Sequence, residues 1–119
     1  MTWLAIGVGG ALGSIARYGV TLFIRGALGI ALINILGCLL IGLLAGALAS
    51  NRIGVPAVWR DFVFVGLLGG FTTFSTFGLD SFILGRSHSV GLAVFNVAGQ
   101  VAGGLLAVWI GYHAALAAR

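Results

Sequence analysis

Four long apolar segments occupy almost the whole chain of 119 residues and constrain its fold more than any other feature. A helix that crosses a bilayer needs about 20 consecutive, mostly apolar residues. Segments that meet this requirement are predicted at residues 2–24, 27–49, 58–84 and 90–117. Only short connections are left over, so residues 1–119 are predicted to form one four-helix transmembrane domain without a soluble part.

The scarcity of charged side chains supports a location in the membrane. Charged residues make up 7% of the chain and hydrophobic residues 61%, whereas soluble domains carry about 25% charged residues. The six basic residues are all arginines and outnumber two aspartates, which gives a formal net charge of +4. The arginines are scattered along the chain rather than clustered. This pattern favours contacts with lipid headgroups and argues against a nucleic-acid partner.

The connections between the apolar segments are short, around Arg25-Gly26, Ser50 to Ala57 and Gly85 to Ser89. Short connections place consecutive helices side by side and antiparallel. The predicted fold class is therefore all-α integral membrane, with four transmembrane helices in an up-down-up-down bundle.

The arginines show almost no bias toward either side of the membrane. Arg52, Arg60 and Arg119 fall on the side of the N-terminus, Arg25 and Arg86 fall on the other side, and Arg17 lies nearer to that other side. Because an excess of positive charge sets the orientation of a membrane protein, a chain without such an excess is predicted to insert both ways. Copies of opposite orientation can pair as an antiparallel, dual-topology dimer. Such a dimer offers more helix surface to line a pore than the four packed helices of one chain.

Glycines spaced four residues apart occur in three of the segments, from Gly9 to Gly13, Gly42 to Gly46 and Gly99 to Gly103. Small residues at this spacing let helix backbones approach closely in lipid. Packing within one chain and contact between two chains are both consistent with the pattern.

Glycines and hydroxyl-bearing residues interrupt the apolar character of the third segment. Gly66, Gly69 and Gly70 precede the run Thr72-Thr73-Phe74-Ser75-Thr76-Phe77-Gly78. Non-helical backbone at membrane depth is stable only where protein or a water-filled cavity covers it, and broken helices are a recurring way to build ion sites. The sequence therefore predicts a third helix that is broken mid-span, with its functional centre at residues 69–76.

Catalysis and proton-coupled transport are disfavoured by the few ionisable residues. His88 and His113 are isolated, and Asp61 and Asp80 are the only carboxylates of the side chains. This set contains no recognisable catalytic arrangement, so the chain is not expected to be an enzyme. A small multidrug-type transporter has a similar size but needs a carboxylate in its first span, where this chain has none. A non-conducting membrane subunit stays open as a further alternative.

The remaining polar groups within the spans are neutral hydrogen-bond donors: Asn34, Thr72, Thr73, Ser75, Thr76, Ser81, Asn96 and Gln100. Asn96 and Gln100 are four residues apart and are predicted to share a helix face, either along a pathway or in contacts between helices. Phe71, Phe74 and Phe77, at intervals of three, are predicted to form one stripe. The edge of an aromatic ring is electropositive. Together with the neutral donors, such rings suit a small, hard anion better than a cation.

The run Gly69-Gly70-Phe71-Thr72-Thr73-Phe74-Ser75-Thr76-Phe77 resembles the signature of the Fluc/CrcB family of fluoride channels. Further resemblance lies in residues 10–18 (GALGSIARY) and in Asn34-Ile35-Leu36-Gly37 of the second span. The resemblance covers essentially the whole chain. It implies an antiparallel dual-topology dimer with two fluoride pores, in the cell membrane of a bacterium.

The resemblance also implies roles for particular residues. Asn34 is expected to line the pore from the second span, Phe74 and Phe77 to line the fluoride path with their rings, and Ser75 and Thr76 to offer hydroxyls. Arg17 is expected at the pore vestibule. The backbone carbonyls of Gly69 and Thr72, from both subunits, are expected to hold a structural sodium ion (Na⁺) at the dimer interface. Asp80 stands where the family commonly has glutamate.

The fourth span departs from the family pattern of a tyrosine and serines. The matching positions are Asn96, Gln100 and Gly104. Amides still donate hydrogen bonds, so both are assigned to the fluoride path. A homodimer is expected, and pairing with a sister chain that supplies other polar groups is the alternative. The function expected from this resemblance is passive, selective export of fluoride.

Overall fold

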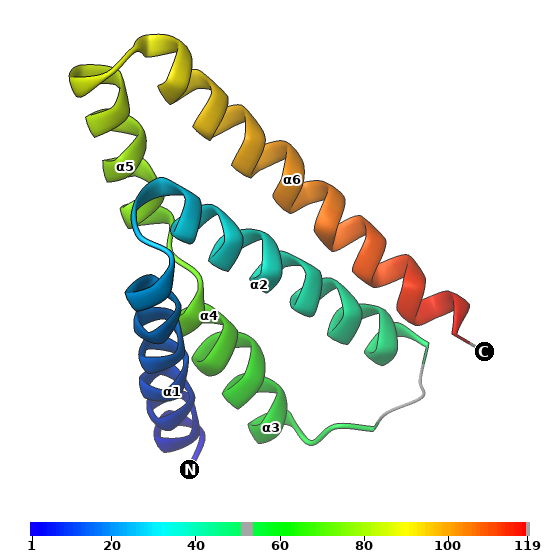
Figure 1. Cartoon of the computed structure of the whole chain (residues 1–119). Helices are drawn as coiled ribbons and strands as arrows, with labels where there is room; N and C mark the ends of the chain where they lie inside the picture. The colour runs from blue at the N-terminus through cyan, green and yellow to red at the C-terminus, as the bar shows by residue number, and fades with distance from the viewer. Residues whose placement is uncertain (51–53, 119) are drawn as a thin grey trace.

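The computed structural model describes residues 1–50 and 54–118 and is all-helical in that part of the chain. Its elements are α1 (Thr2–Phe23), α2 (Gly26–Ala49), α3 (Ala57–Asp61), the π-helix η1 (Phe62–Leu68), α4 (Gly69–Phe71), α5 (Phe74–Ser87) and α6 (Val90–Ala117) (Figure 1). Arg52 and Arg119 lie outside the described residues. Both were counted above among the arginines on the side of the N-terminus.

Four helical segments of the described residues are long and apolar enough to cross a bilayer: Thr2–Phe23, Gly26–Ala49, Ala57–Ser87 and Val90–Ala117. The predicted all-α class with four spans is thereby confirmed. The third span ends at Ser87, three residues after the predicted bound at residue 84, and the other helix ends differ from the predicted bounds by no more than one residue.

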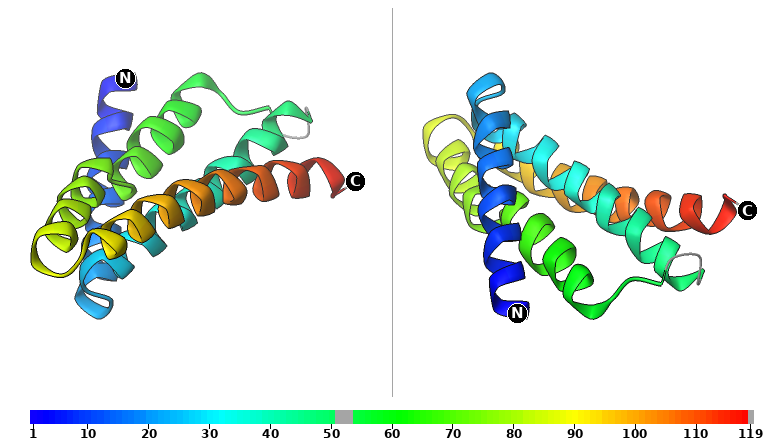
Figure 2. Two further views of the ribbon diagram at one scale, coloured as in Figure 1. Left: turned by 90° about the horizontal axis from the view of Figure 1, so that it is seen from above. Right: turned by 90° about the horizontal axis from the view of Figure 1, so that it is seen from below.

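The four spans form two pairs that meet at the middle of the molecule. In Figures 1 and 2, α1 lies beside the first half of the third span, while α2 lies beside α6. Helix α1 packs on η1 and α4, and α6 packs on both α2 and α5. The α1–α2 connection turns at Gly26, whose φ of +72° favours glycine.

The third span is broken where the sequence predicts it. Helix α4 ends at Phe71, Thr72 (φ −82°, ψ 160°) and Thr73 (φ −153°, ψ 117°) are extended, and α5 begins at Phe74. The prediction of a break within residues 69–76 is therefore confirmed. The π-helix η1, which directly precedes α4, was not predicted because no residue type in Phe62–Leu68 distinguishes a π-helix from an α-helix.

Glycines bring the backbone of α1 into contact with that of the third span. A Cβ atom added to Gly9 would lie 2.5 Å from the carbonyl oxygen of Phe62, and one added to Gly70 would lie 2.6 Å from that of Gly10. Neither distance leaves room for a methyl group. The Gly9–Gly13 spacing therefore serves packing within the chain and positions α4, the segment that leads into the break.

A second glycine contact joins α2 to α6. A Cβ atom on Gly46 would lie 2.9 Å from the Cβ atom of Ala115, and one on Gly111 would lie 2.8 Å from the backbone nitrogen of Leu43. The Gly42–Gly46 spacing thus also serves packing within the chain. Gly99 has no atom within 4 Å of an added Cβ, so the third spacing does not act in the same way.

The same substitution at two glycines of α1 is expected to have opposite effects on stability. Gly13→Ala places a Cβ atom 2.8 Å from the backbone nitrogen of Phe71, and such overpacking costs about 1–3 kcal/mol. Gly7→Ala meets no atom within 4 Å and gains up to about 1 kcal/mol from helix propensity. Thermal unfolding of both variants in detergent tests this; equal midpoints would contradict the close contact.

Candidate functional site

A mostly apolar cavity of about 330 Å³ lies beside the break in the third span. Residues from α2, from both halves of the third span and from α6 line it. The sequence-predicted residues among them are Asn34, Gly69, Thr72, Phe74, Phe77 and Gln100. The fold thus brings the candidate residues of three spans to one cavity at mid-span.

The amide of Asn34, on α2, closes a double hydrogen bond with the extended backbone of the break. The Thr73 N–H donates to Asn34 Oδ1 at 2.9 Å, and Asn34 Nδ2 donates to the Thr73 carbonyl at 3.2 Å. The same Nδ2 donates to Gln100 Oε1 at 2.9 Å. Asn34 therefore satisfies backbone groups that the break takes out of the helix, and it links the break to α6.

From Gln100 a run of hydrogen bonds continues along α6 and back to α5. Gln100 Nε2 donates to Asn96 Oδ1 at 3.0 Å, and Asn96 Nδ2 donates to Ser81 Oγ at 2.9 Å. Ser81 Oγ donates in turn to the Phe77 carbonyl at 2.8 Å. We call this run, from Thr73 through Asn34, Gln100 and Asn96 to Ser81, the amide chain. It confirms that Asn96 and Gln100 share a helix face.

Three hydroxyl groups gather where α5 begins. Thr73 Oγ1 lies 3.3 Å from Ser75 Oγ and 3.1 Å from Thr76 Oγ1, and it accepts a hydrogen bond from the Thr76 N–H at 3.3 Å. Thr73 is thus the N-cap of α5. The two contacts between hydroxyl oxygens use two of the three hydroxyl hydrogens. One O–H donor is left for another acceptor.

The phenylalanine rings do not form the predicted stripe of three. Phe74 and Phe77 lie on α5 with ring centroids 5.3 Å apart and planes inclined at 55°. Phe71, at the end of α4 before the break, is buried in one core cluster with Phe77. The prediction of one stripe of three rings is wrong because Phe74, unlike the other two, is exposed. The side chain of Phe74 is 82% exposed in a single chain, whereas that of Phe77 is 6% exposed.

The carbonyls at the end of α4 have lost their regular helical donors. The Thr73 N–H, which a continuous helix would direct to Gly69, donates to Asn34, and the Thr76 N–H, which would be directed to Thr72, donates to the Thr73 hydroxyl. Arg17 Nη1 lies 3.4 Å from the Thr72 carbonyl oxygen. Arg17 therefore reaches the break in the third span, and its place at a pore vestibule stays a prediction.

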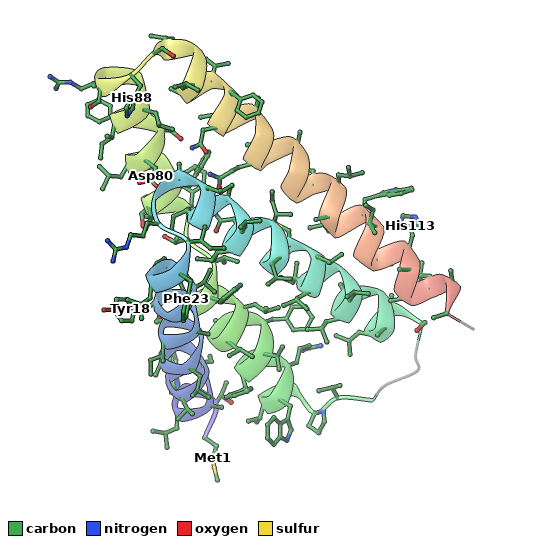
Figure 3. The ribbon with its side chains drawn as sticks, in the orientation of Figure 1. Met1, Tyr18, Phe23, Asp80, His88 and His113 are labelled. Atoms are coloured by element: carbon green, nitrogen blue, oxygen red, sulfur yellow. The ribbon has the colours of Figure 1, made fainter. Side chains whose placement is uncertain are left out.

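The histidines and carboxylates of the described residues lie apart from one another. Asp80 lies on α5, and its buried Oδ2 has no hydrogen-bond partner within residues 1–50 and 54–118. In Figure 3, His88 lies at the corner between α5 and α6, far from His113 near the other end of α6. Among the residues that the structure describes, no group of three or more His, Cys, Asp or Glu could hold a metal ion.

Two residues of the site had no role assigned from the sequence. Thr73 joins the amide chain through its backbone and the hydroxyl cluster through its side chain, and Ser81 closes the amide chain. Both were visible as neutral donors within a span, but their partners are distant in sequence.

Gly104, the third matching position of the fourth span, is buried, and a Cβ atom there would lie 3.2 Å from Cys38 Sγ.

Comparison with known proteins gives matches over nearly the whole chain. The family model described as CrcB-like protein, Camphor Resistance (CrcB), matches residues 4–112. A protein of Methylobacillus flagellatus named "Fluoride-specific ion channel FluC" is 39% identical over 117 residues, which cover 92% of this chain and 91% of the relative. Proteins of the same name from Chloroflexus aurantiacus (46% identical; 91% and 90% covered) and Rhodospirillum rubrum (38% identical; 98% and 95% covered) are similar.

Proposed function

The chain belongs to the CrcB-like family of multi-pass membrane proteins, and we propose that it is a fluoride-specific channel through which fluoride leaves the cell passively. The observation that carries this proposal is the cavity beside the broken helix, where aromatic rings adjoin neutral N–H and O–H donors. Among the described residues, no carboxylate lines that cavity, whereas a proton-coupled exporter needs a carboxylate to exchange its proton. The protein is not an enzyme, in keeping with its family.

Fluoride is small and strongly hydrated, so a pore has to replace the water that the ion loses. Hydroxyl and amide hydrogens supply hydrogen bonds, and the electropositive edges of phenyl rings supply weaker contacts. The residues proposed to line the path are Asn34, Phe74, Ser75, Thr76, Phe77, Asn96 and Gln100. The guanidinium of Arg17, which lies beside the break, raises the local concentration of anions.

The functional unit proposed is an antiparallel homodimer with two pores. Phe74 exposes 82% of its side chain in a single chain, and the break presents extended backbone beside a cavity at membrane depth. Asn34 satisfies the backbone of Thr73, but the Gly69 carbonyl has lost its regular helical donor, and lipid cannot supply another, so a second protein surface is favoured here. A second copy is the occupant that the balanced distribution of arginines favours. A sister chain in the place of that copy is the alternative.

A structural sodium ion at the dimer interface is part of the proposal. The carbonyls of Gly69 and Thr72 fit such a site because their regular helical donors are directed elsewhere. Two copies together would offer four carbonyl oxygens, which are the ligands that hard alkali cations accept in membrane proteins. In each copy, Arg17 Nη1 lies 3.4 Å from the Thr72 carbonyl and competes for that oxygen.

Removal of sodium is expected to weaken the dimer. The thermal midpoint of the purified dimer should fall when N-methylglucamine replaces sodium at constant chloride and ionic strength, because a ligand that binds only the native state stabilises it. Restored sodium should restore the midpoint. Equal midpoints in both solutions, with sodium verified as absent, would contradict the sodium site.

The function is tested by fluoride efflux from liposomes that contain the purified protein, measured with a fluoride electrode beside a chloride electrode. Fast release of fluoride without chloride is the expected result. If a folded dimer releases no fluoride, the homodimeric channel is ruled out. The same assay with added candidate sister chains then separates an obligate heterodimer from a non-conducting subunit.

A further inference from the structure

The amide chain has a fixed direction because backbone groups hold both of its ends. At one end, the Thr73 N–H can only donate, so it faces Asn34 Oδ1. The Thr73 carbonyl can only accept, so it faces Asn34 Nδ2. At the other end, the Phe77 carbonyl can only accept, so the Ser81 hydroxyl donates to it and has to accept from Asn96. Both ends impose the same direction on the two amides between them.

This direction determines which amide hydrogens are free. Both Nδ2 hydrogens of Asn34 are engaged, one by the Thr73 carbonyl and one by Gln100 Oε1. Gln100 Nε2 and Asn96 Nδ2 each engage one hydrogen and keep the second. Asn34 therefore has no free N–H for an anion. Its oxygen Oδ1 can still accept one more hydrogen bond, but an oxygen with a free lone pair repels an anion.

We infer that Gln100 gives fluoride its amide hydrogen bond, through the second Nε2 hydrogen, and that Asn34 is a positioning residue that holds Gln100 in the orientation for this bond. The inference rests on the proposed function. Gln100 lines the cavity and is 8% exposed, whereas Asn96 does not line the cavity. A buried N–H without a partner is unfavourable, and an anion that accepts from it forms a strong, charge-assisted bond.

Asn34 acts on this donor through Gln100 Oε1. With Oε1 fixed by Asn34 and one Nε2 hydrogen fixed by Asn96, the plane of the Gln100 amide is held at two atoms. The second Nε2 hydrogen then has one direction available. Loss of Asn34 frees Oε1 and lets the amide rotate or flip.

The inference can be tested by following side-chain amides in the wild-type dimer with NMR. Gln100 is the only glutamine in the chain, so glutamine labelled with ¹⁵N at Nε2 gives one pair of signals without further assignment. Addition of fluoride, with chloride as the control ion, is expected to shift one signal of this pair strongly. In a sample labelled at asparagine Nδ2, the Asn34 hydrogens are expected to shift little.

Two variants test the separate roles. Gln100→Met keeps the length of the side chain and should lower fluoride flux at subsaturating fluoride by about tenfold or more, the factor for one lost hydrogen bond to an ion. In Asn34→Asp, the Gln100 signal should need about tenfold more fluoride to shift, because its amide is no longer held. Thr21→Val, which removes a hydroxyl that bonds only to the Tyr18 carbonyl of its own helix, should match the wild type.

The outcomes separate this inference from the function on which it rests. If the wild-type protein releases no fluoride from liposomes, both fall. If it conducts, but fluoride shifts the Asn34 hydrogens and not those of Gln100, only the assignment of the donor is overturned. Wild-type flux in Gln100→Met would overturn it as well.

Discussion

Replacement of Phe74 by isoleucine is expected to abolish fluoride flux while the protein still folds and pairs. The Phe74 side chain is 82% exposed in one chain, so it contributes little to the core of the protomer. Isoleucine keeps an apolar side chain but lacks the electropositive ring edge that we propose faces the ion. A loss of flux of about 100-fold or more is expected, since an increase of about 2.7 kcal/mol in the barrier has this effect.

Liposome efflux beside gel filtration measures flux and pairing of the Phe74→Ile dimer. Phe95→Ile is the matched control, because Phe95 is 76% exposed on α6 and does not line the cavity. This control should keep wild-type flux. If Phe74→Ile conducts as fast as Phe95→Ile, the ring of Phe74 does not form part of the fluoride path.

Asn34→Asp is also expected to abolish flux, although the two side chains have the same shape. An ionised aspartate donates no hydrogen bond, so both the Thr73 carbonyl and Gln100 Oε1 lose their donor. A protonated aspartate can serve only one of them. In addition, a negative charge at the cavity repels the anion. An unsatisfied buried acceptor costs about 1–3 kcal/mol, so a lower thermal midpoint is expected together with the loss of flux.

The two effects of Asn34→Asp can be measured separately. Circular dichroism and gel filtration report whether the helices and the dimer persist, and efflux is then measured on the folded fraction. Flux within about twofold of the wild type, a difference of about 0.4 kcal/mol, would show that the hydrogen bonds of Asn34 are not needed for conduction.

The architecture was largely predictable from the sequence because each span is defined by local composition. Lipid requires a continuous apolar stretch, and the four stretches are separated by residues such as Arg25 and Ser50 that mark the helix ends. The break was predictable for the same reason, since glycines and hydroxyl residues cluster at one place in the third span. The extended residues Thr72 and Thr73 lie inside that cluster.

The partners within the site were less predictable because they depend on contacts between distant segments. The bond between Asn34 and the backbone of Thr73 involves an N–H and a carbonyl, which every residue carries. No side-chain pattern distinguishes Thr73 from Thr72 in this respect. The error in the stripe of three phenylalanines has a similar origin: the interval of three residues predicts a common face only if the helix is continuous, and the break separates Phe71 from Phe74.

The direction of the amide chain has a consequence for electrical measurements. Asn96 and Gln100 lie one turn apart along α6, and their amides are hydrogen-bonded head to tail, so the amide dipoles give each proposed path a polarity. A single path of this kind is expected to rectify, with unequal currents at equal and opposite voltages. In the antiparallel dimer that we propose, the second path has the opposite polarity, so the two asymmetries cancel and the current–voltage curve is symmetric. A dimer in which only one path is blocked should reveal the asymmetry of the other.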